Sequence, residues 1–356
     1  MAGTDTGLRA YIGSFTSEGG AGITVASRDP ESGALCPRHT TDVVANPSYL
    51  ALAPGGDILY TVRETDDGAA AALMVTDPGT PPVPLAAPVS VRGAGPTHLA
   101  LAGGHLLTAN YVSGSVTALP LLDGGALGEP TAVFQDEGSG PHPERQRGPH
   151  AHHVRPDPSG RWLLTVDLGT DAVRIYGLPG LRPHGAVSLR PGSGPRHLTF
   201  HPRGERAYVI NELEPTLTTC RWDAADGRLE PLGETPVLPG GSGSGRSEPR
   251  GSAGECFPSE VVVSGDGRFA WAAARGTDTV TTFALDATGD RPEPVATTSC
   301  GGSWPRDLAL GPEGRHLYAA NERSGDVTWF SLDPATGVPR QAGSLAVPAA
   351  SCVVFG

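Results

Sequence analysis

The sequence predicts an all-β fold, a seven-bladed β-propeller, from three observations: a repeated pattern, the even spacing of its copies and the scarcity of helical periodicity. Short runs of β-branched, aromatic and Leu/Ala residues alternate with turn residues, among them 50 Gly and 35 Pro in 356 residues. This composition is typical of many short strands joined by turns. No stretch keeps a 3.6-residue apolar period, so we expect little helix.

Each copy of the repeat begins with Pro and a polar residue, followed by an apolar strand, a Gly/Pro turn, a second strand that ends in polar residues, and a third strand. Six copies occupy residues 46–64, 95–111, 152–168, 194–213, 257–276 and 304–322. Pro47 and Pro96 are 49 residues apart, and Pro258 and Pro305 are 47 apart. Such periods suit a four-stranded propeller blade.

The seventh copy is split between the two ends of the chain. Residues 347–356 supply only its opening strand, and residues 9–35 supply the remainder. The C-terminal strand is therefore predicted to complete the N-terminal blade, a closure that leaves no exposed sheet edge.

Repeat folds grow as one unit, so we expect a single domain over residues 9–356 after a disordered N-terminus, residues 1–8. The interval from Pro195 to Pro258 is 63 residues because it holds a Gly/Ser-rich insertion, residues 240–255. Its composition predicts a flexible loop.

Composition narrows the possible partners. The formal net charge of −12 argues against nucleic acid and anionic membranes. All 26 cationic side chains are Arg, which excludes Schiff-base and P-loop lysines. The chain has no signal-like start, no apolar run long enough to span a membrane and five cysteines without a CxxC pair. We expect a cytoplasmic protein with free thiols, either a monomer or a simple homo-oligomer.

The first strand of each propeller blade lines the central channel, and its start lies beside the end of the second strand. Two columns of residues should therefore meet at one mouth. The first column is Ser48, Thr97, His152, Arg196, Ser259, Arg306 and Ala349, and the second is Tyr49, His98, His153, His197, Glu260, Asp307 and Ala350. The second strands end in Arg63-Glu64, Asn110-Tyr111, Asp167-Leu168, Asn211-Glu212, Ala274-Arg275 and Asn321-Glu322. These positions differ from blade to blade, which indicates a shaped site.

Cations at this mouth contrast with the acidic chain: Arg63, Arg196, Arg275 and Arg306. They indicate a small anionic substrate, because Arg presents a planar fork to carboxylate or phosphate. The alternative is that they form ion pairs between blades, with Arg306 and Asp307 the best candidates for such a pair. For strand-end Asn residues the alternative is hydrogen bonding to a turn.

The segment 136–153 is the densest in reactive side chains, with Arg145, Arg147 and four His residues, His142, His150, His152 and His153. An H-x-H pair can bind a metal ion, but no carboxylate or Cys stands at matching spacing. We expect no metal there and a catalytic or substrate-binding role for His152. No dinucleotide, P-loop, GxSxG or HExxH motif is present, so no cofactor is expected.

Three segments, GPHAHHVRPDPSGRWLLTVDLGTD, GPRHLTFHPRGERAYVINEL and LYAANERSGDV, resemble the propeller-type lactonase family. That family includes bacterial 6-phosphogluconolactonases and fungal enzymes that cyclise 3-carboxymuconate, and the resemblance covers about residues 9–356.

The family's proposed site has one His, two Arg and one Glu. The resemblance therefore implies His152, Arg196, Arg275 and Glu212 as catalytic residues, with His150 as a register alternative to His152. Ala274 stands where family members often have Asn. The substrate-binding residues that we expect around this set are His98, Asn110, His150, His197, Asn211, Arg306 and Asn321.

Two enzymatic hypotheses follow. In lactone hydrolysis, Glu212 or His152 would activate water, while Arg196 and Arg275 would bind the anion and stabilise the oxyanion. In lactone formation, the same residues would clamp substrate carboxylates and deliver a proton to carbon; a related cyclisation or ring opening in a specialised pathway is a variant of these. The non-enzymatic hypothesis is a propeller scaffold for protein partners, although the repeats lack the Trp-Asp and Gly-His residues of WD40 blades.

Overall fold

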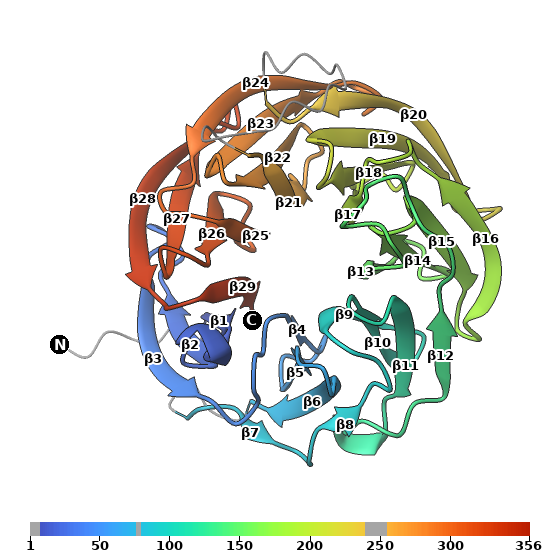
Figure 1. Cartoon of the computed structure of the whole chain (residues 1–356). Coiled ribbons are helices and arrows are strands. Elements are labelled where there is room, and N and C mark those ends of the chain that lie inside the picture. Colours follow the sequence, from blue (N-terminus) through green and yellow to red (C-terminus); the bar gives the residue numbers. More distant parts are fainter. Residues whose placement is uncertain (1–7, 76–79, 239–254) are drawn as a thin grey trace.

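The computed structural model describes residues 8–75, 80–238 and 255–356. It shows seven twisted antiparallel sheets arranged as blades around a central axis (Figure 1). The prediction of an all-β seven-bladed propeller is confirmed, and helix is limited in the described residues to two 3₁₀ turns, Thr16–Glu18 and Asp123–Gly125.

Blade 1 contains both chain ends and blades 2–7 follow in sequence order. From the axis outwards, blade 1 consists of β29 (Ala350–Phe355), β1 (Arg9–Ser14), β2 (Ile23–Arg28) and β3 (Leu35–Thr41), and blade 2 consists of β4 (Leu50–Leu52), β5 (Ile58–Arg63), β6 (Ala69–Met74) and the short outer pieces β7 (Val83–Pro84) and β8 (Val89–Ser90). In the same order, blade 3 consists of β9 (Pro96–Ala102), β10 (His105–Asn110), β11 (Ser115–Pro120) and β12 (Ala132–Gln135), blade 4 of β13 (Ala151–Pro156), β14 (Trp162–Asp167), β15 (Ala172–Gly177) and β16 (Arg182–Ser188), and blade 5 of β17 (Pro195–Phe200), β18 (Arg206–Asn211), β19 (Thr216–Asp223) and β20 (Arg228–Pro236). Blade 6 consists of β21 (Phe257–Val263), β22 (Phe269–Arg275), β23 (Thr279–Leu285) and β24 (Pro292–Ser299), and blade 7 of β25 (Pro305–Leu310), β26 (His316–Asn321), β27 (Asp326–Leu332) and β28 (Pro339–Ala346).

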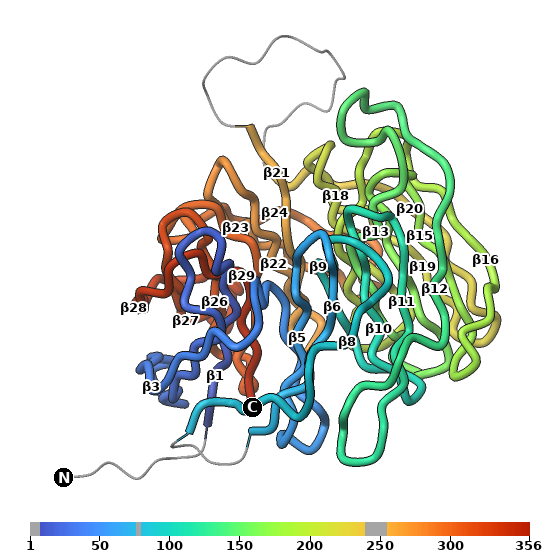
Figure 2. The backbone as a smooth tube through the Cα atoms, turned by 60° about the horizontal axis from the view of Figure 1, so that its bottom comes forward, coloured from blue at the N-terminus to red at the C-terminus, as the bar shows by residue number. Residues whose placement is uncertain are grey.

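The ring closes as predicted. The C-terminal strand β29 pairs antiparallel with β1, in a register that joins Ala10 to Phe355 and Ile12 to Val353. The two strands run side by side in the view of Figure 2. Because β29 fills the inner position of blade 1, the ring has no unpaired inner edge at its seam.

The core lies between blades. One buried cluster joins Leu164 and Val166 of blade 4 to Val209 of blade 5, and another joins Ile12 of blade 1 to Tyr318 of blade 7. Second-strand aromatics also bond the turn of a neighbouring blade: the Tyr318 hydroxyl donates to the Gly33 carbonyl oxygen at 2.7 Å, the Tyr208 hydroxyl to Gly289 and the Trp271 Nε1–H to Gly337, each at 2.8 Å. These three bonds fix blades 5, 6 and 7 each to the next blade of the ring, which holds the side chains at its axis in place.

The expected register of the last strand was wrong by two residues. Ala350 pairs with Ser14 as Pro305 pairs with Asn321, so Ser351 and Cys352 take the column positions expected for Ala349 and Ala350. Ala349 has a φ of 52°, as Trp304 before Pro305 has a φ of 65°, so Ala350 and not Pro348 occupies the position of the repeat proline. Pro348 therefore precedes the strand by more residues than the proline of the other blades does.

Two predicted segments fall largely outside the described residues: the insertion 240–255, of which only residue 255 is described, and the N-terminus 1–8. At Leu8, the described end of the latter, the carbonyl oxygen accepts a hydrogen bond of 3.1 Å from the Arg28 amide. The five cysteines are all described; Cys36 is exposed, and Cys220, Cys256, Cys300 and Cys352 are buried.

Candidate active site

A β-bulge in the inner strand turns one side chain of each of five blades towards the same mouth of the ring. The ladder with the second strand skips one residue in each of these strands, and the skipped residues are Thr97, His152, Arg196, Arg306 and Ser351. In blade 6 it skips both Ser259 and Glu260. Bulges change the direction of a side chain and are frequent at active sites. The side chains of the first column therefore point together towards one mouth of the ring.

Glu212 is the centre of the mouth and is bonded by three arginines. Its Oε1 lies 2.7 Å from Arg145 Nη2, while its Oε2 lies 2.6 Å from Arg275 Nη2 and 3.2 Å from Arg196 Nε. Burial alone would raise the pKa of Glu212, but the charges of Arg275, Arg196 and Arg145 lower it to about 2. Glu212 is ionised at neutral pH, and these four side chains, the Glu212 cluster, carry a net charge of +2.

Two of the arginines are fixed and the third is accessible. The Arg196 guanidinium donates to the Ser259 carbonyl oxygen, and Arg275 Nε donates to the Phe257 carbonyl oxygen at 3.2 Å. Their side chains are 3% and 8% exposed, against 37% for Arg145. Burial, with the neighbouring charge of Arg275, lowers the pKa of Arg196 to about 9. Arg145 is therefore the cation of this cluster that a ligand reaches first.

His152 lies beside the cluster as a neutral imidazole. Burial and the charge of Arg196 hold its pKa well below the usual value of a histidine. Its Nδ1 is buried and has no hydrogen-bond partner, and its ring lies 5.5 Å from that of Tyr111 and 5.0 Å from that of His197, measured between ring centroids. A neutral imidazole keeps one lone pair, which is what a general base requires.

His150, the register alternative, has a different environment. Its ring stacks on Tyr111 at 4.5 Å, and its Nδ1 lies 2.9 Å from the Tyr111 carbonyl oxygen. The Tyr111 hydroxyl in turn accepts a hydrogen bond of 3.0 Å from Arg145 Nη2. His150 thus contacts Tyr111, which holds Arg145, whereas His152 lies within the influence of the Arg196 charge.

A second polar hollow adjoins the first and is lined by Ser48, Glu64, Thr97, Arg196, His197 and Arg306. Burial raises the pKa of Glu64, whose carboxylate accepts a hydrogen bond from the Ser48 hydroxyl. Arg306 Nη1 lies 2.8 Å from Glu322 Oε2, and its guanidinium stacks over the Phe15 ring at 4.8 Å. The ion-pair alternative named Asp307 as the partner of Arg306, but Arg306 pairs with Glu322 instead, because successive strand residues face different neighbours.

The second column forms a layer one step deeper in the channel, made of Tyr49, His98, His153, His197, Glu260 and Asp307; we call it the waist layer. Its rings are in contact, with centroids 4.0 Å apart for Tyr49 and His98, 4.0 Å for His98 and His153, and 4.4 Å for His153 and His197. His98 and His197, expected to bind substrate, lie in this layer rather than at its surface, although His197 also borders the second hollow.

The three strand-end asparagines, Asn110, Asn211 and Asn321, are fully buried inside their own blades. Each Nδ2 donates to a threonine hydroxyl of the third strand, at 2.9 Å to Thr117, 2.8 Å to Thr218 and 2.6 Å to Thr328. One arrangement repeated in three blades is a structural feature, and a role in substrate binding stays a prediction. Arg63 pairs with Asp67 at 2.7 Å, away from the Glu212 cluster.

Sequence reasoning assigned no specific role to three neighbours of the site, Arg145, Glu64 and Trp304, although Glu64 stood among the strand ends expected at this mouth. Arg145 lies in the segment noted for its density of His and Arg, but no strand register fixes where that loop places it. Trp304 directly precedes β25, and its ring lies 5.6 Å from the Arg275 guanidinium. An Arg in a His-rich loop before an inner strand was the available signal.

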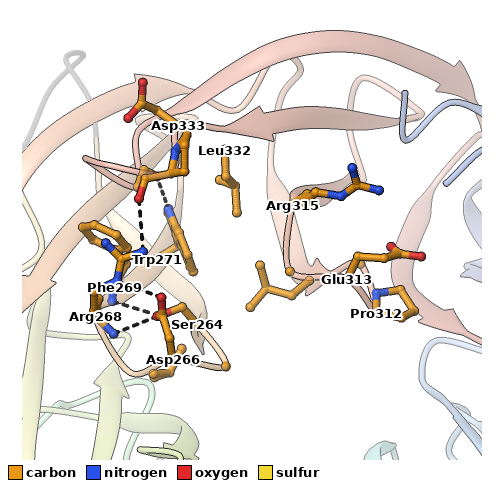
Figure 3. Close-up of a pocket in the computed structure, with 17 residues that line it drawn as sticks. Ser264, Asp266, Arg268, Phe269, Trp271, Pro312, Glu313, Arg315, Leu332 and Asp333 are labelled. Carbon is orange, nitrogen blue, oxygen red and sulfur yellow. Dashed lines mark hydrogen bonds and ion pairs between the residues drawn. The ribbon is translucent and has the colours of Figure 1, made fainter. Parts of the chain in front are cut away.

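Larger hollows lie elsewhere in the described part of the chain, and the main one does not bring together charged side chains without partners. A cavity of about 540 Å³ occupies the opposite end of β21 and β22, between their turn and those of blade 7 (Figure 3). Its charged groups are bonded locally, with Arg268 Nε 2.7 Å from Asp266 and Trp271 Nε1 donating to the Gly337 carbonyl oxygen. We interpret it as a groove between packed blades.

In residues 8–75, 80–238 and 255–356, no three His, Cys, Asp or Glu side chains converge as a metal ion would need. Within the same ranges, no helix has the length and hydropathy to cross a bilayer.

The family described as lactonase, 7-bladed β-propeller, matches residues 9–355. The chain belongs to this family. A 6-phosphogluconolactonase of Bacillus subtilis is 31% identical over 78% of this chain and 77% of its own length.

Solved structures agree with this assignment. A Bacteroides fragilis protein crystallised as a candidate 6-phosphogluconolactonase superposes with a TM-score of 0.90 at 30% identity, covering 100% of this chain and 99% of its own. A periplasmic gluconolactonase of Pseudomonas aeruginosa gives a TM-score of 0.88 at 29% identity, with 98% of each chain covered.

Proposed function

We propose that this protein hydrolyses a small anionic sugar lactone of the 6-phosphogluconolactone type. The observation that carries the proposal is the Glu212 cluster beside a neutral His152, buried together at one mouth of the ring. Holding three guanidinium groups around one carboxylate costs desolvation free energy, and a purely structural scaffold has no need of the two excess charges.

In the proposed reaction His152 is the general base. It removes a proton from water as the oxygen attacks the lactone carbonyl carbon, and Arg196 and Arg275 stabilise the oxyanion that forms. The ring C–O bond then breaks, and the leaving alkoxide takes the proton from His152. The carboxylic acid produced ionises, so that one proton is released in each turnover.

Glu212 is a poor candidate for the base, contrary to one of the two sequence-based options. Both of its oxygens are engaged in ion pairs at 2.6–3.2 Å, and a carboxylate with a pKa of about 2 binds a proton weakly at neutral pH. We assign it instead the task of holding the arginines parallel and close without their mutual repulsion separating them.

Arg145 is assigned to the anionic group of the substrate, because it is the accessible member of the cluster. Its Nη2 is shared between Tyr111 and Glu212, at 3.0 and 2.7 Å, so a phosphate or carboxylate can replace one of these partners without moving the buried arginines. Relatives named for a phosphorylated and for an unphosphorylated lactone both match the chain, so the anion is the part of the substrate to be tested.

The lactonase names of these relatives favour hydrolysis over lactone formation. No observation in the described residues favours the cyclase or the scaffold, and neither is proposed further. A cytoplasmic location, the oligomeric state and the exclusion of nucleic acid stay predictions.

The test is turnover of fresh 6-phosphogluconolactone, followed by acid release, with glucono-δ-lactone assayed in parallel. We expect rapid hydrolysis by the wild type, and a loss of about 100-fold or more in Arg196→Ala and His152→Asn. The matched control is Arg63→Ala, which removes an arginine of the same strand-end column that is paired outside the cluster. No rate above the spontaneous background on either lactone would overturn the proposal.

A further inference from the structure

Behind His152, three titratable side chains from blades 5, 6 and 7 form a bonded chain. His197 Nδ1 lies 2.6 Å from Glu260 Oε2. Glu260 Oε1 accepts the Val261 amide at 2.8 Å, and Asp307 Oδ2 accepts the Val353 amide at 2.9 Å. The Glu260 and Asp307 carboxyl groups interact with each other and line one cavity, so the buried pair holds a proton more readily than either group would alone.

The backbone bonds do not distinguish the two carboxyl groups, because each accepts one amide, and the order of their pKa values assigns the proton. Burial raises the pKa of both carboxyl groups, to about 7 for Glu260, and the neighbouring Glu260 raises the pKa of Asp307 further. Asp307 is therefore the protonated member and donates to Glu260, which remains an acceptor for the Nδ1–H of His197. His197 then has its lone pair on Nε2.

Four buried ring nitrogens of this region have no hydrogen-bond partner: His98 Nε2, His153 Nδ1, His197 Nε2 and His152 Nδ1. Of these, His152 is the ring at the mouth, and its centroid lies 5.0 Å from that of His197 at an interplanar angle of 62°. Both side chains are more than nine-tenths buried, so an unmatched nitrogen on each is costly. One water that accepts from His152 Nδ1–H and donates to His197 Nε2 removes both costs together, provided that the two nitrogens have opposite protonation.

We propose that Asp307, Glu260 and His197 form a positioning chain that fixes the tautomer of His152. The Nδ1–H of His152 is directed at Nε2 of His197 through one bridging water, which leaves the lone pair of His152 on Nε2 for the substrate water. This assignment rests on the proposed function for its catalytic consequence. The logic is that of a buried acid that orients a catalytic imidazole.

The chain also gives the proton a balanced path. When His152 Nε2 takes the proton of water, the Nδ1 proton can pass to His197 Nε2, and the Nδ1 proton of His197 to the Glu260 carboxylate. No bond other than N–H and O–H changes along this path. The alkoxide of the product draws the proton back by the reverse shift, or the proton leaves at the far end.

The far end of the chain opens on a separate cavity of about 120 Å³, lined among others by Tyr49, His153, Arg155, Glu260 and Asp307. A space of this size with polar walls holds several waters. Proton loss on this side avoids the mouth, where the net positive charge of the Glu212 cluster opposes it.

The kinetic test is Glu260→Gln in the full-length protein, on the lactone that the wild type hydrolyses. Glutamine keeps the shape, but it cannot take up a proton, and its NH2 group can face His197 Nδ1 in place of the oxygen, so the tautomer of His197 is no longer fixed. We expect kcat to fall about 10- to 100-fold with KM within about twofold, because the substrate contacts are untouched. An unchanged kcat would overturn the proposal.

The control is Asp136→Asn. Asp136 is also a buried carboxyl whose pKa burial raises to about 7, but it pairs with Arg174 at 3.2 Å in the outer part of the ring. The Asp136→Asn variant loses one buried carboxyl group, and we expect it to keep the kcat of the wild type. A fall in kcat equal to that of Glu260→Gln would show a general effect of removing buried charge and overturn the positioning role.

A second measurement needs neither a variant nor activity: ¹⁵N-resolved NMR of the histidine rings of the wild type. We expect His152 and His197 as neutral Nδ1–H tautomers. An Nε2–H tautomer of His152 would overturn the chain even in an active enzyme. If the wild type hydrolyses no lactone, the proposed function fails while this spectrum still decides the tautomers.

Discussion

The mouth and the waist layer of the channel each bury a glutamate, but they shift its pKa in opposite directions. Glu212 is 3% exposed and Glu260 is 7% exposed, yet the pKa of the first is lowered to about 2 and that of the second is raised to about 7. Burial is nearly equal, so it does not explain the difference. Glu212 contacts three guanidinium groups, whereas Glu260 contacts a neutral imidazole and a second carboxyl group.

The comparison shows that two adjacent layers of one channel can differ in charge: the side chains of the mouth stay ionised, whereas the histidines of the waist layer stay neutral. The mouth holds permanent charges where an anion would bind. In the waist layer, burial and nearby positive charge hold the pKa of His98, His153 and His197 well below the usual value. Neutral rings can then pack at 4.0–4.4 Å, a separation at which three imidazolium ions would repel strongly.

The largest expected effect comes from removing the carboxylate of the mouth. In Glu212→Gln three arginines lose their shared counter-charge, which should lower the free energy of unfolding by about 3–5 kcal/mol and activity by about 100-fold or more. Denaturant unfolding and lactone turnover measure the two effects. Glu214→Gln, two residues further along the same loop, is the control and should change both little.

The pH dependence should distinguish the two layers by sign. The pKa of Glu212 is lowered from 4.5 to about 2 on folding, so its stabilisation is present above pH 4.5 and disappears as the pH falls towards 2. The difference should be about 3 kcal/mol. Unfolding of wild type and Glu212→Gln at a series of pH values should show their gap closing over this range. A gap independent of pH would mean that Glu212 is not held ionised.

Glu260 should show the opposite dependence. Its pKa is raised from 4.5 to about 7, so its contribution is present below pH 4.5 and is lost as the pH rises through 7. Wild-type stability should decline over this window by up to about 3 kcal/mol more than that of Glu260→Gln. Asp136 titrates in the same range in both proteins and cancels in the comparison. Parallel curves for the two proteins would contradict the assignment.

A smaller effect is expected at the accessible edge of the mouth. Arg145→Ala should raise KM for a phosphorylated lactone about tenfold, the value of one charge-assisted hydrogen bond, and change KM for an unphosphorylated lactone little. Arg147→Ala is matched in loop and charge, but its guanidinium donates to the Pro143 carbonyl oxygen. Equal effects of the two variants would indicate general electrostatic attraction rather than a specific contact.

The smallest effect concerns the framework. Asn110→Ala removes hydrogen bonds to Ser115 and Thr117 and should cost about 1–2 kcal/mol of stability, with kcat and KM unchanged. Unfolding and turnover measured on one preparation check both. A change in KM without loss of stability would restore the substrate-binding role expected from the sequence.

The repeat determined the fold, including the closure by β29, because strand period and turn residues are local properties of the chain. It also placed Arg196, Glu212 and Arg275 at strand ends that share one mouth, and the structure bonds these three directly. His152 was found through the same column. These four residues are the part of the candidate site that the sequence alone supplied.

Only the tertiary structure decided the rest, since it depends on distances across the ring. The pairing of β29 with β1 places Ser351, and not Ala349, in the last position of the first column. Arg145 reaches Glu212 from a loop without a repeat register. Glu260 and Asp307 are 47 residues apart in the sequence, and nothing local indicates that they share a proton. Residue types and strand ends are written in the sequence, whereas the pKa of a buried group is set by neighbours that only the closed ring brings within hydrogen-bonding distance.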